Sequence, residues 1–191
     1  HAPFRQRSVE SVVKEISGQL EKRKIGFIDF EDENISLNKK WFLALLSELQ
    51  TLFAGRSVEL RAMNGLYPPS LDEEVIQMME KTGFTTLNLS VGSTSKKQLD
   101  RFNRPDVRSA FETVLKLADQ YNLPTVSYLI AGAPDQDPHA TLADLIFLAQ
   151  QKTIIGLSIY YPAPGSLDYQ KCRDQHLPPD DFNPLRSSAF P

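Results

Sequence analysis

Acidic side chains cluster at the end of the first strand that the sequence predicts. The strand covers residues 25–30, and Asp29, Glu31, Asp32 and Glu33 lie at or just beyond its end. Carboxylates grouped in this way can hold a divalent cation through hard oxygen ligands. The plainer alternative is a solvated turn before a helix, where negative charge suits the helix dipole. Asp29 stands apart because it lies between apolar strand residues, and a buried carboxylate needs polar partners.

Polar and small residues also follow the later predicted strands. Glu59 and Arg61 share one face of a strand predicted at residues 57–63. The C-terminal ends of parallel strands meet at one edge, where α/β proteins bind ligands. The other candidates at this edge are Asn64, Ser90, Gly92, Ser93, Thr94, Ser95, Arg104, Tyr128, Gly132, Tyr160, Tyr161 and Gly165. The alternatives are a helix cap for the serines, tight turns for the glycines and a surface role for the arginine. Spacing alone therefore predicts a rim that binds a small polar ligand.

Hydrophobic periodicity alternates between strand and helix along the whole chain. Strands are predicted at residues 25–30, 57–63, 85–91, 125–130 and 154–160, and helices at 8–20, 38–53, 68–83, 95–102, 107–121 and 140–150. A repeat of about 30 residues is the size of a βαβ crossover, so the strands are expected to run parallel. The sheet either curls toward a barrel or lies open, because a complete eight-fold barrel takes about 250 residues.

Composition excludes several classes of protein. The chain has 191 residues and a net charge of −3, which disfavours a nucleic-acid groove. It contains no apolar run near the roughly 18 residues of a membrane span, and no signal-peptide pattern. Cys172 is the only cysteine, so an internal disulfide is impossible and a metal–thiolate site cannot form from this chain alone. We therefore expect a cytoplasmic protein without membrane or nucleic-acid partners.

Several stretches, taken together, resemble the radical S-adenosylmethionine (radical SAM) enzymes, especially the subgroup that often carries an upstream cobalamin-binding domain. The resemblance covers roughly residues 4 to 170, and its order and spacing are more specific than any single motif. Its segments are residues 5–16, Phe30-Glu31-Asp32-Glu33-Asn34, residues 71–84, Ser90-Val91-Gly92-Ser93 through Leu99 with Asn103-Arg104, Ala131-Gly132-Ala133-Pro134-Asp135-Gln136, and Tyr160-Tyr161-Pro162-Ala163-Pro164-Gly165-Ser166.

The resemblance implies an α/β fold: a partial, open (β/α) barrel of alternating parallel strands and helices. We expect this domain at residues 1–171 and an irregular, proline-rich C-terminal tail at residues 172–191. The family binds a [4Fe–4S] cluster through a C-x3-C-x2-C motif, and this chain has no such motif. The expected explanation is a chain that starts just downstream of the third cysteine and is inactive alone. Its truncated edge at the first strand would favour self-association.

The resemblance also implies roles for individual residues. Glu31, Asp32 and Glu33 match the segment whose backbone binds the methionine amino group of S-adenosylmethionine. Glu59 and Arg61 match a strand with a polar contact to the cofactor. Gly92 stands where many relatives have a glutamine or glutamate for the ribose, a contact that Ser93 could take. The remaining matches are Arg104 for the methionine carboxylate, Tyr128 for the ribose side, and Gly132, Ala133 and Tyr160 for the adenine.

The expected function is that of a radical SAM enzyme fragment, which binds S-adenosylmethionine at the strand ends for reductive cleavage by a [4Fe–4S] cluster held upstream. A corrinoid could take part in the parent protein. One alternative is a barrel enzyme that holds a divalent metal through Asp29, Glu31 and Asp32. The other is a non-catalytic module that binds a cofactor or a partner. No catalytic residue and no metal ligand can be assigned from the sequence.

Overall fold

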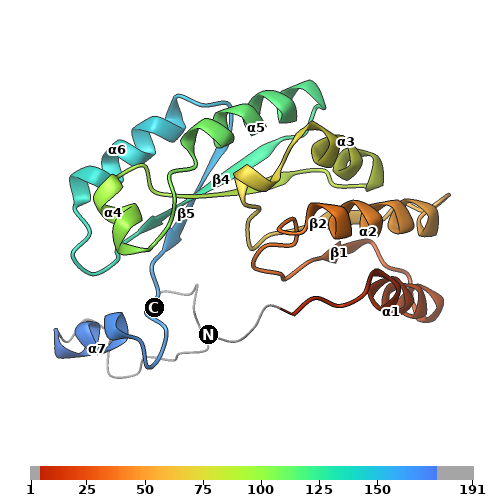
Figure 1. Ribbon diagram of the computed structural model, residues 1–191, viewed down its shortest axis with the longest axis horizontal. Helices are drawn as coiled ribbons and strands as arrows, with labels where there is room; N and C mark the ends of the chain where they lie inside the picture. Colours follow the sequence, from red (N-terminus) through yellow and green to blue (C-terminus); the bar gives the residue numbers. More distant parts are fainter. Residues whose placement is uncertain (1–4, 176–191) are drawn as a thin grey trace. The chain divides into compact units, whose positions relative to one another are not determined.

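The computed structural model describes residues 5–175 (Figure 1). These residues divide into two compact units. The first unit contains residues 5–90 and 107–126, and the second contains residues 91–106 and 127–175. In the part of the chain that is described, the strands form two sheets and no closed barrel. The predicted open α/β architecture of parallel strands is confirmed.

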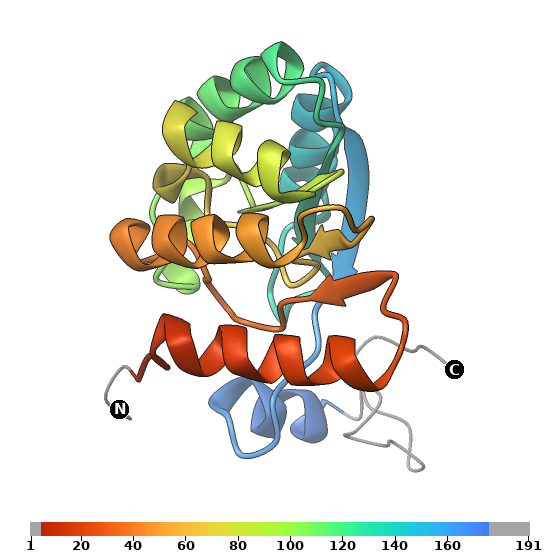
Figure 2. The same ribbon diagram turned by 90° about the vertical axis from the view of Figure 1, so that its right-hand side faces the viewer.

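Three helices of the first unit lie side by side, which Figure 2 shows clearly. They are α1 (Val9–Lys22), α2 (Lys39–Leu52) and α3 (Glu73–Thr82). Each begins at a side-chain cap, because the oxygens of Ser8, Asn38 and Asp72 accept hydrogen bonds from backbone N–H groups three residues later. These caps satisfy donors that the first turn of a helix otherwise leaves unpaired.

The core of the first unit lies between its helices and a short parallel sheet. Strand β1 (Phe27–Asp29) pairs with β2 (Glu59–Arg61), with Ile28 opposite Leu60. The apolar stripe of α2 is fully buried at Phe42, Leu45, Leu46 and Leu49. The 3-10 turn η1 (Pro68–Ser70) and α5 (Arg108–Gln120) complete this unit.

Gly83 ends α3 in a conformation that only glycine adopts easily. Its φ is +114°, and a Cβ atom there would lie 2.7 Å from the carbonyl oxygen of Val58. The carbonyl of Gly83 also accepts a hydrogen bond from Leu60 N–H at 2.9 Å. The end of α3 is therefore tied to strand β2.

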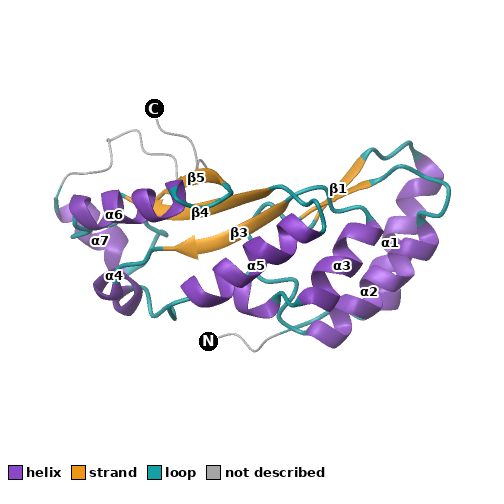
Figure 3. Ribbon diagram, turned by 90° about the horizontal axis from the view of Figure 1, so that it is seen from above, coloured by secondary structure: helices purple, strands orange, loops and turns teal. Residues whose placement is uncertain are grey.

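The second unit is built on the sheet β3-β4-β5 (Figure 3). Strands β3 (Leu87–Gly92) and β4 (Thr125–Ala131) end in this unit, and β5 (Ile154–Ile159) lies wholly within it. Its helices are α4 (Lys96–Arg101), α6 (Pro138–Ala149) and α7 (Leu167–Asp174). Every predicted strand and helix is therefore present, with ends shifted by a few residues.

Helix α7 is an element that the sequence analysis did not predict. It begins where Ser166 Oγ accepts a hydrogen bond from Tyr169 N–H at 3.0 Å, and it extends to Asp174. Cys172 to Asp174 are therefore helical, not irregular as predicted for a tail from Cys172. The rest of that tail, from His176, lies outside the described residues, and the division at residue 171 stays a prediction.

None of the helices within residues 5–175 combines the length and the apolar character that crossing a membrane requires.

Candidate functional site

The acidic residues of the first unit end β1 and continue into the following loop. Asp29 is the last residue of β1, and its Oδ1 accepts a hydrogen bond from Met63 N–H at 3.2 Å. Asn64 Nδ2 donates to the carbonyl oxygen of Glu31 at 2.9 Å and to its Oε2 at 3.2 Å. Asp32 and Glu33 are exposed. These contacts join the loops that follow β1 and β2, which places the acidic segment at the C-terminal end of this sheet.

The acidic segment does not form a metal site. Within the described residues, no group of three or more histidine, cysteine, aspartate or glutamate side chains could hold a metal ion. A divalent cation needs several oxygen ligands at once. The alternative in which Asp29, Glu31 and Asp32 together hold a metal therefore lacks the geometry that it requires.

Glu59 and Arg61 form an ion pair inside the first unit. Arg61 Nη2 donates to Glu59 Oε2 at 2.7 Å, and Thr85 Oγ1 donates to Glu59 Oε1 at 3.0 Å. The hydrogen bond from Arg61, with that from Thr85, lowers the pKa of Glu59, and the bond to Glu59 raises the pKa of Arg61. The guanidinium also lies 4.1 Å from the ring centre of Phe27. Glu59 begins β2 and Arg61 ends it, so only Arg61 lies at the C-terminal end of the strand.

In the second unit, the loop after β3 is anchored on helix α6. Ser93 is 1% exposed, and its hydroxyl donates to Asp144 Oδ2 at 2.6 Å. The backbone N–H and the hydroxyl of Thr94 both donate to Asp144 Oδ1, at 2.7 and 2.5 Å. The resemblance implies a ribose contact for Ser93. In the structure, its hydroxyl is buried and already donates its proton to Asp144.

Gly92 and Arg104 lie against each other at the end of β3. Gly92 has a φ of +78°, and a Cβ atom there would lie 3.5 Å from Arg104 Nη1. Arg104 therefore occupies the space beside Gly92 toward which a side chain at this position would point. Arg104 is itself exposed.

Tyr128 packs over a glycine of the neighbouring strand. It lies on the half-buried face of β4, and a Cβ atom at Gly156 would approach its ring carbons to 2.5 and 2.6 Å. The absence of a side chain at Gly156 is therefore what allows the Tyr128 ring to lie against β5.

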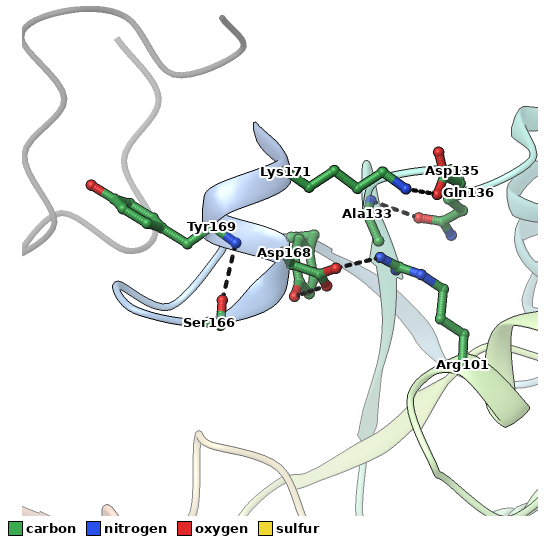
Figure 4. A network of polar contacts seen from close by, with 9 residues as sticks. Arg101, Ala133, Asp135, Gln136, Ser166, Asp168, Tyr169 and Lys171 are labelled. Carbon is green, nitrogen blue, oxygen red and sulfur yellow. Dashed lines mark hydrogen bonds and ion pairs between the residues drawn. The ribbon is translucent and has the colours of Figure 1, made fainter. Parts of the chain in front are cut away.

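The turn after β4 is closed by one side chain, Gln136 (Figure 4). Its Oε1 accepts from Ala133 N–H at 2.9 Å, and its Nε2 donates to the carbonyl oxygen of Ile130 at 2.8 Å. Gly132 has a φ of +80° in this turn. Ala133 N–H donates to Gln136, and Tyr160 N–H donates to the carbonyl oxygen of Ala131 at 2.7 Å. Both N–H groups are therefore engaged, and a ligand at this turn would have to contact other atoms of Ala133 and Tyr160.

Asp168 of α7 binds the end of β5 to helix α4. Its carboxylate accepts from Arg101 Nη2 at 2.7 Å, as Figure 4 shows, and from the Tyr160 hydroxyl at 2.5 Å. Burial of the phenol, followed by its hydrogen bond to this carboxylate, raises the pKa of Tyr160 to about 12. The Tyr160 ring stacks on Phe102 with centres 5.7 Å apart. Lys171 pairs with Asp135 nearby.

The candidate residues therefore fall into two sets. The first unit holds Glu31, Asp32, Glu33, Glu59 and Arg61, and the second holds Ser93, Arg104, Tyr128, Gly132, Ala133 and Tyr160. Sequence reasoning missed the side chains that fix the second set, namely Arg101, Asp144 and Asp168. Gln136, which also holds this set in place, did have a sequence signal, because it belongs to the motif that begins at Ala131.

Comparison with known proteins finds no matching family model, but it does find relatives in sequence and in structure. The anaerobic magnesium-protoporphyrin IX monomethyl ester cyclase of Cereibacter sphaeroides is 24% identical over 174 residues, which cover 90% of this chain and 28% of the cyclase. The bacteriochlorophyllide d C-12(1)-methyltransferase of Chlorobaculum tepidum is 25% identical over 177 residues, which cover 90% of this chain and 38% of the methyltransferase.

Solved structures show the fold to which the chain is similar. The radical SAM methyltransferase TsrM of Kitasatospora setae, with cobalamin and a [4Fe–4S] cluster bound, superposes with a TM-score of 0.67 at 18% identity, over 81% of this chain and 31% of TsrM. Coproporphyrinogen III oxidase (HemN) of Escherichia coli, a radical SAM enzyme, has a TM-score of 0.61 at 16% identity, over 94% of this chain and 41% of HemN. The chain is thus similar in sequence to a cyclase and a methyltransferase, and it has the fold of radical SAM enzymes of known structure.

This chain spans about 28% and 38% of the length of the curated relatives that it matches. Its residues cannot by themselves provide the thiolates of an iron–sulfur cluster, because Cys172 is the only cysteine and is buried in α7.

Proposed function

We propose that these residues form part of a radical SAM enzyme and contribute to binding S-adenosylmethionine. Two observations support this proposal. Two enzymes are similar in sequence over 90% of this chain, and the chain has the fold of the radical SAM enzymes TsrM and HemN. A structure of TsrM contains an S-adenosylmethionine analogue. The cofactor pair of such enzymes supplies reductive cleavage of S-adenosylmethionine, with the electron coming from the cluster.

The donor groups on this chain suit the polar parts of S-adenosylmethionine. In the first unit, the acidic segment Glu31, Asp32 and Glu33 is exposed at the end of β1. Its negative charge is opposite to that of the methionine ammonium group. In the second unit, the guanidinium of Arg104 has the planar fork that binds a carboxylate with two hydrogen bonds. Tyr128 offers an aromatic ring beside β5, and the turn at Gly132 offers backbone groups.

The [4Fe–4S] cluster does not fit this chain, because a cluster needs several thiolates and Cys172 is buried. We propose that its cysteines belong to another part of the polypeptide. The sequence relation to a methyltransferase, together with the structure of TsrM with bound cobalamin, supports a corrinoid as a second cofactor of the whole protein.

Location and partners belong to the same proposal. We place the protein in the cytoplasm, where a reducing environment preserves thiolate ligands. Among residues 5–175, strand β1 pairs only with β2, which supports the hypothesis of self-association through the other edge of β1. Light scattering across a concentration series checks this hypothesis, since a mass that stays monomeric contradicts it.

Equilibrium binding tests the role of this chain directly. S-adenosylhomocysteine is the suitable probe, because it retains the adenosine and amino-acid groups and cannot be cleaved reductively at a sulfonium. We expect the 191-residue chain to bind it in a calorimetric titration, and Arg104→Ala to weaken binding about tenfold, which corresponds to about 1.4 kcal/mol.

Arg56→Ala is the matched control, because Arg56 is also an exposed arginine and lies in the first unit beyond the end of α2. Its dissociation constant should equal that of the wild type. Equal affinity of the Arg104→Ala variant and the wild type would contradict the role given to Arg104. Absence of wild-type binding would contradict cofactor binding by this chain and favour a non-catalytic module that binds a partner.

A further inference from the structure

Asp144 is a buried carboxylate on a helix that is otherwise largely apolar. It is 1% exposed, and its neighbours along α6 include Leu142, Ile146 and Leu148. A carboxylate loses several kcal/mol of hydration when it is buried, unless hydrogen bonds replace the water. Aspartate is also a weak helix former in the interior of a helix. The position of Asp144 therefore requires a compensating set of contacts.

Three hydrogen bonds to this carboxylate come from one loop. Ser93 Oγ donates to Oδ2 at 2.6 Å, while Thr94 N–H and Thr94 Oγ1 donate to Oδ1 at 2.7 and 2.5 Å. These donors lie about 50 residues earlier in the sequence, in the turn between β3 and α4. Hydrogen bonds to an ionised acceptor are short and roughly twice as strong as neutral ones. Asp144 therefore fixes both the backbone and the side chains of this turn.

The anchored turn continues in both directions. Ser93 Oγ accepts a hydrogen bond from Ser95 N–H at 3.1 Å, which extends the anchor to the N-cap of α4. On the other side, Gly92 has a left-handed φ of +78°, and Arg104 lies in the space above its Cα. Gly92 and Ser93 share a peptide plane, so the anchored position of Ser93 restrains the backbone on the C-terminal side of Gly92.

We propose that Asp144 is the positioning residue of the β3–α4 turn. It acts through Ser93 and Thr94, and it holds the backbone of Gly92 in the conformation against which the Arg104 guanidinium lies. The role of Asp144 in ligand binding rests on the proposed function, in which Arg104 contacts the cofactor. The anchoring of the turn does not depend on any ligand.

Hydrogen exchange of the ligand-free 191-residue chain tests the anchor. In Asp144→Ala, the Thr94 amide loses its acceptor and the Ser95 amide loses the fixed Ser93 oxygen. We expect both amides to exchange about tenfold faster than in the wild type, with little change elsewhere in β3 and β4. Asp144→Asn retains one carbonyl oxygen for Thr94 N–H, so its Thr94 amide should stay within about threefold of the wild type.

Asp100→Ala is the matched control, because Asp100 lies on α4 near the turn and its carboxylate pairs with Lys96 at the surface. Its turn amides should exchange as in the wild type. Ser93→Ala provides a second test that removes one arm of the anchor while Asp144 keeps Thr94, and it should speed exchange of the Ser95 amide. Unchanged exchange of Thr94 and Ser95 in Asp144→Ala, or of Ser95 in Ser93→Ala, would overturn the proposal.

The same variants in a titration with S-adenosylhomocysteine separate this inference from the proposed function. We expect Asp144→Ala to raise the dissociation constant about tenfold, Asp144→Asn to recover most of the affinity, and Asp100→Ala to match the wild type. If Asp144 only stabilised the fold, Asp144→Ala would lower stability and Asp144→Asn would not restore the affinity. If the wild type binds no ligand, the proposed function fails, while the exchange experiment still decides whether Asp144 anchors the turn.

Discussion

The Tyr160 hydroxyl provides a quantitative test of the contacts at the end of β5. It donates to Asp168 at 2.5 Å, and the same carboxylate accepts from Arg101. Burial and this hydrogen bond raise the pKa of Tyr160 to about 12, against about 10 in an unfolded chain. Because the folded-state pKa is the higher one, the stabilisation is complete below about pH 10 and is lost as the pH rises toward 12.

The magnitude follows from the shift of about two pKa units, which would correspond to about 2.7 kcal/mol for a fully shielded group. Tyr160 is half-buried, so solvent screening reduces the contribution to about 1 kcal/mol. Between pH 8 and pH 11, wild-type protein should lose about 0.5 kcal/mol more of its unfolding free energy than Tyr160→Phe, which has no phenol to ionise.

Two assays measure this difference. Urea denaturation followed by circular dichroism gives the unfolding free energy of both proteins at pH 8 and pH 11. Tyrosinate absorbance, taken as wild type minus Tyr160→Phe, gives the titration of this one phenol, with an expected midpoint clearly above pH 10. Asp168→Asn removes the negative charge and should move the midpoint toward pH 10. A wild-type difference curve centred near pH 10 would refute the reasoning.

The other predictions concern substitutions at Gly83, Gly156 and the control position Gly18. The variants Arg104→Ala and Asp144→Ala are tested as described above. Gly83→Ala forces an alanine to a φ of +114° and places its Cβ 2.7 Å from Val58 O, so it should lower the unfolding free energy by about 2 kcal/mol or more in urea denaturation. Gly18→Ala is its control, because that position has no atom within 4 Å of the new Cβ and lies inside α1, where alanine should stabilise by roughly 0.5–1 kcal/mol. Gly156→Ala would push the Tyr128 ring off β5 at a cost of about 1–3 kcal/mol, and the ring proton shifts of Tyr128 in an NMR spectrum should change; unchanged shifts would contradict the packing.

The order of elements could be predicted because local patterns determine it. The apolar stripe of α2, the caps at Ser8 and Asn38, and the glycine after α3 are all visible within one or two helical turns of sequence. The ends of the first two strands could not be predicted in this way, because only three residues of β1 pair with three residues of β2. Helix α7 was missed because it lies between a proline-rich turn and a polar segment, where periodicity carries little signal.

The side chains that hold the candidate site could not be predicted in the same way. Asp144 is one acidic residue in an apolar helix, and its partners Ser93 and Thr94 are about 50 residues away. Arg101 and Asp168 are similarly distant in sequence. Such pairs depend on how the elements pack, which periodicity does not reveal. The resemblance indicated which strand ends matter, and the structure adds which groups there are already engaged.

Anaerobic reconstitution of the complete natural polypeptide that contains this chain tests the proposed function most directly. The experiment measures iron bound per chain and the formation of 5′-deoxyadenosine from S-adenosylmethionine under a strong reductant. We expect about four irons per chain, as a [4Fe–4S] cluster requires, and reductant-dependent 5′-deoxyadenosine. If corrinoid-dependent methyl transfer is the only reaction, S-adenosylhomocysteine should accumulate instead. Absence of bound iron together with absence of either product would contradict the assignment as a radical SAM enzyme.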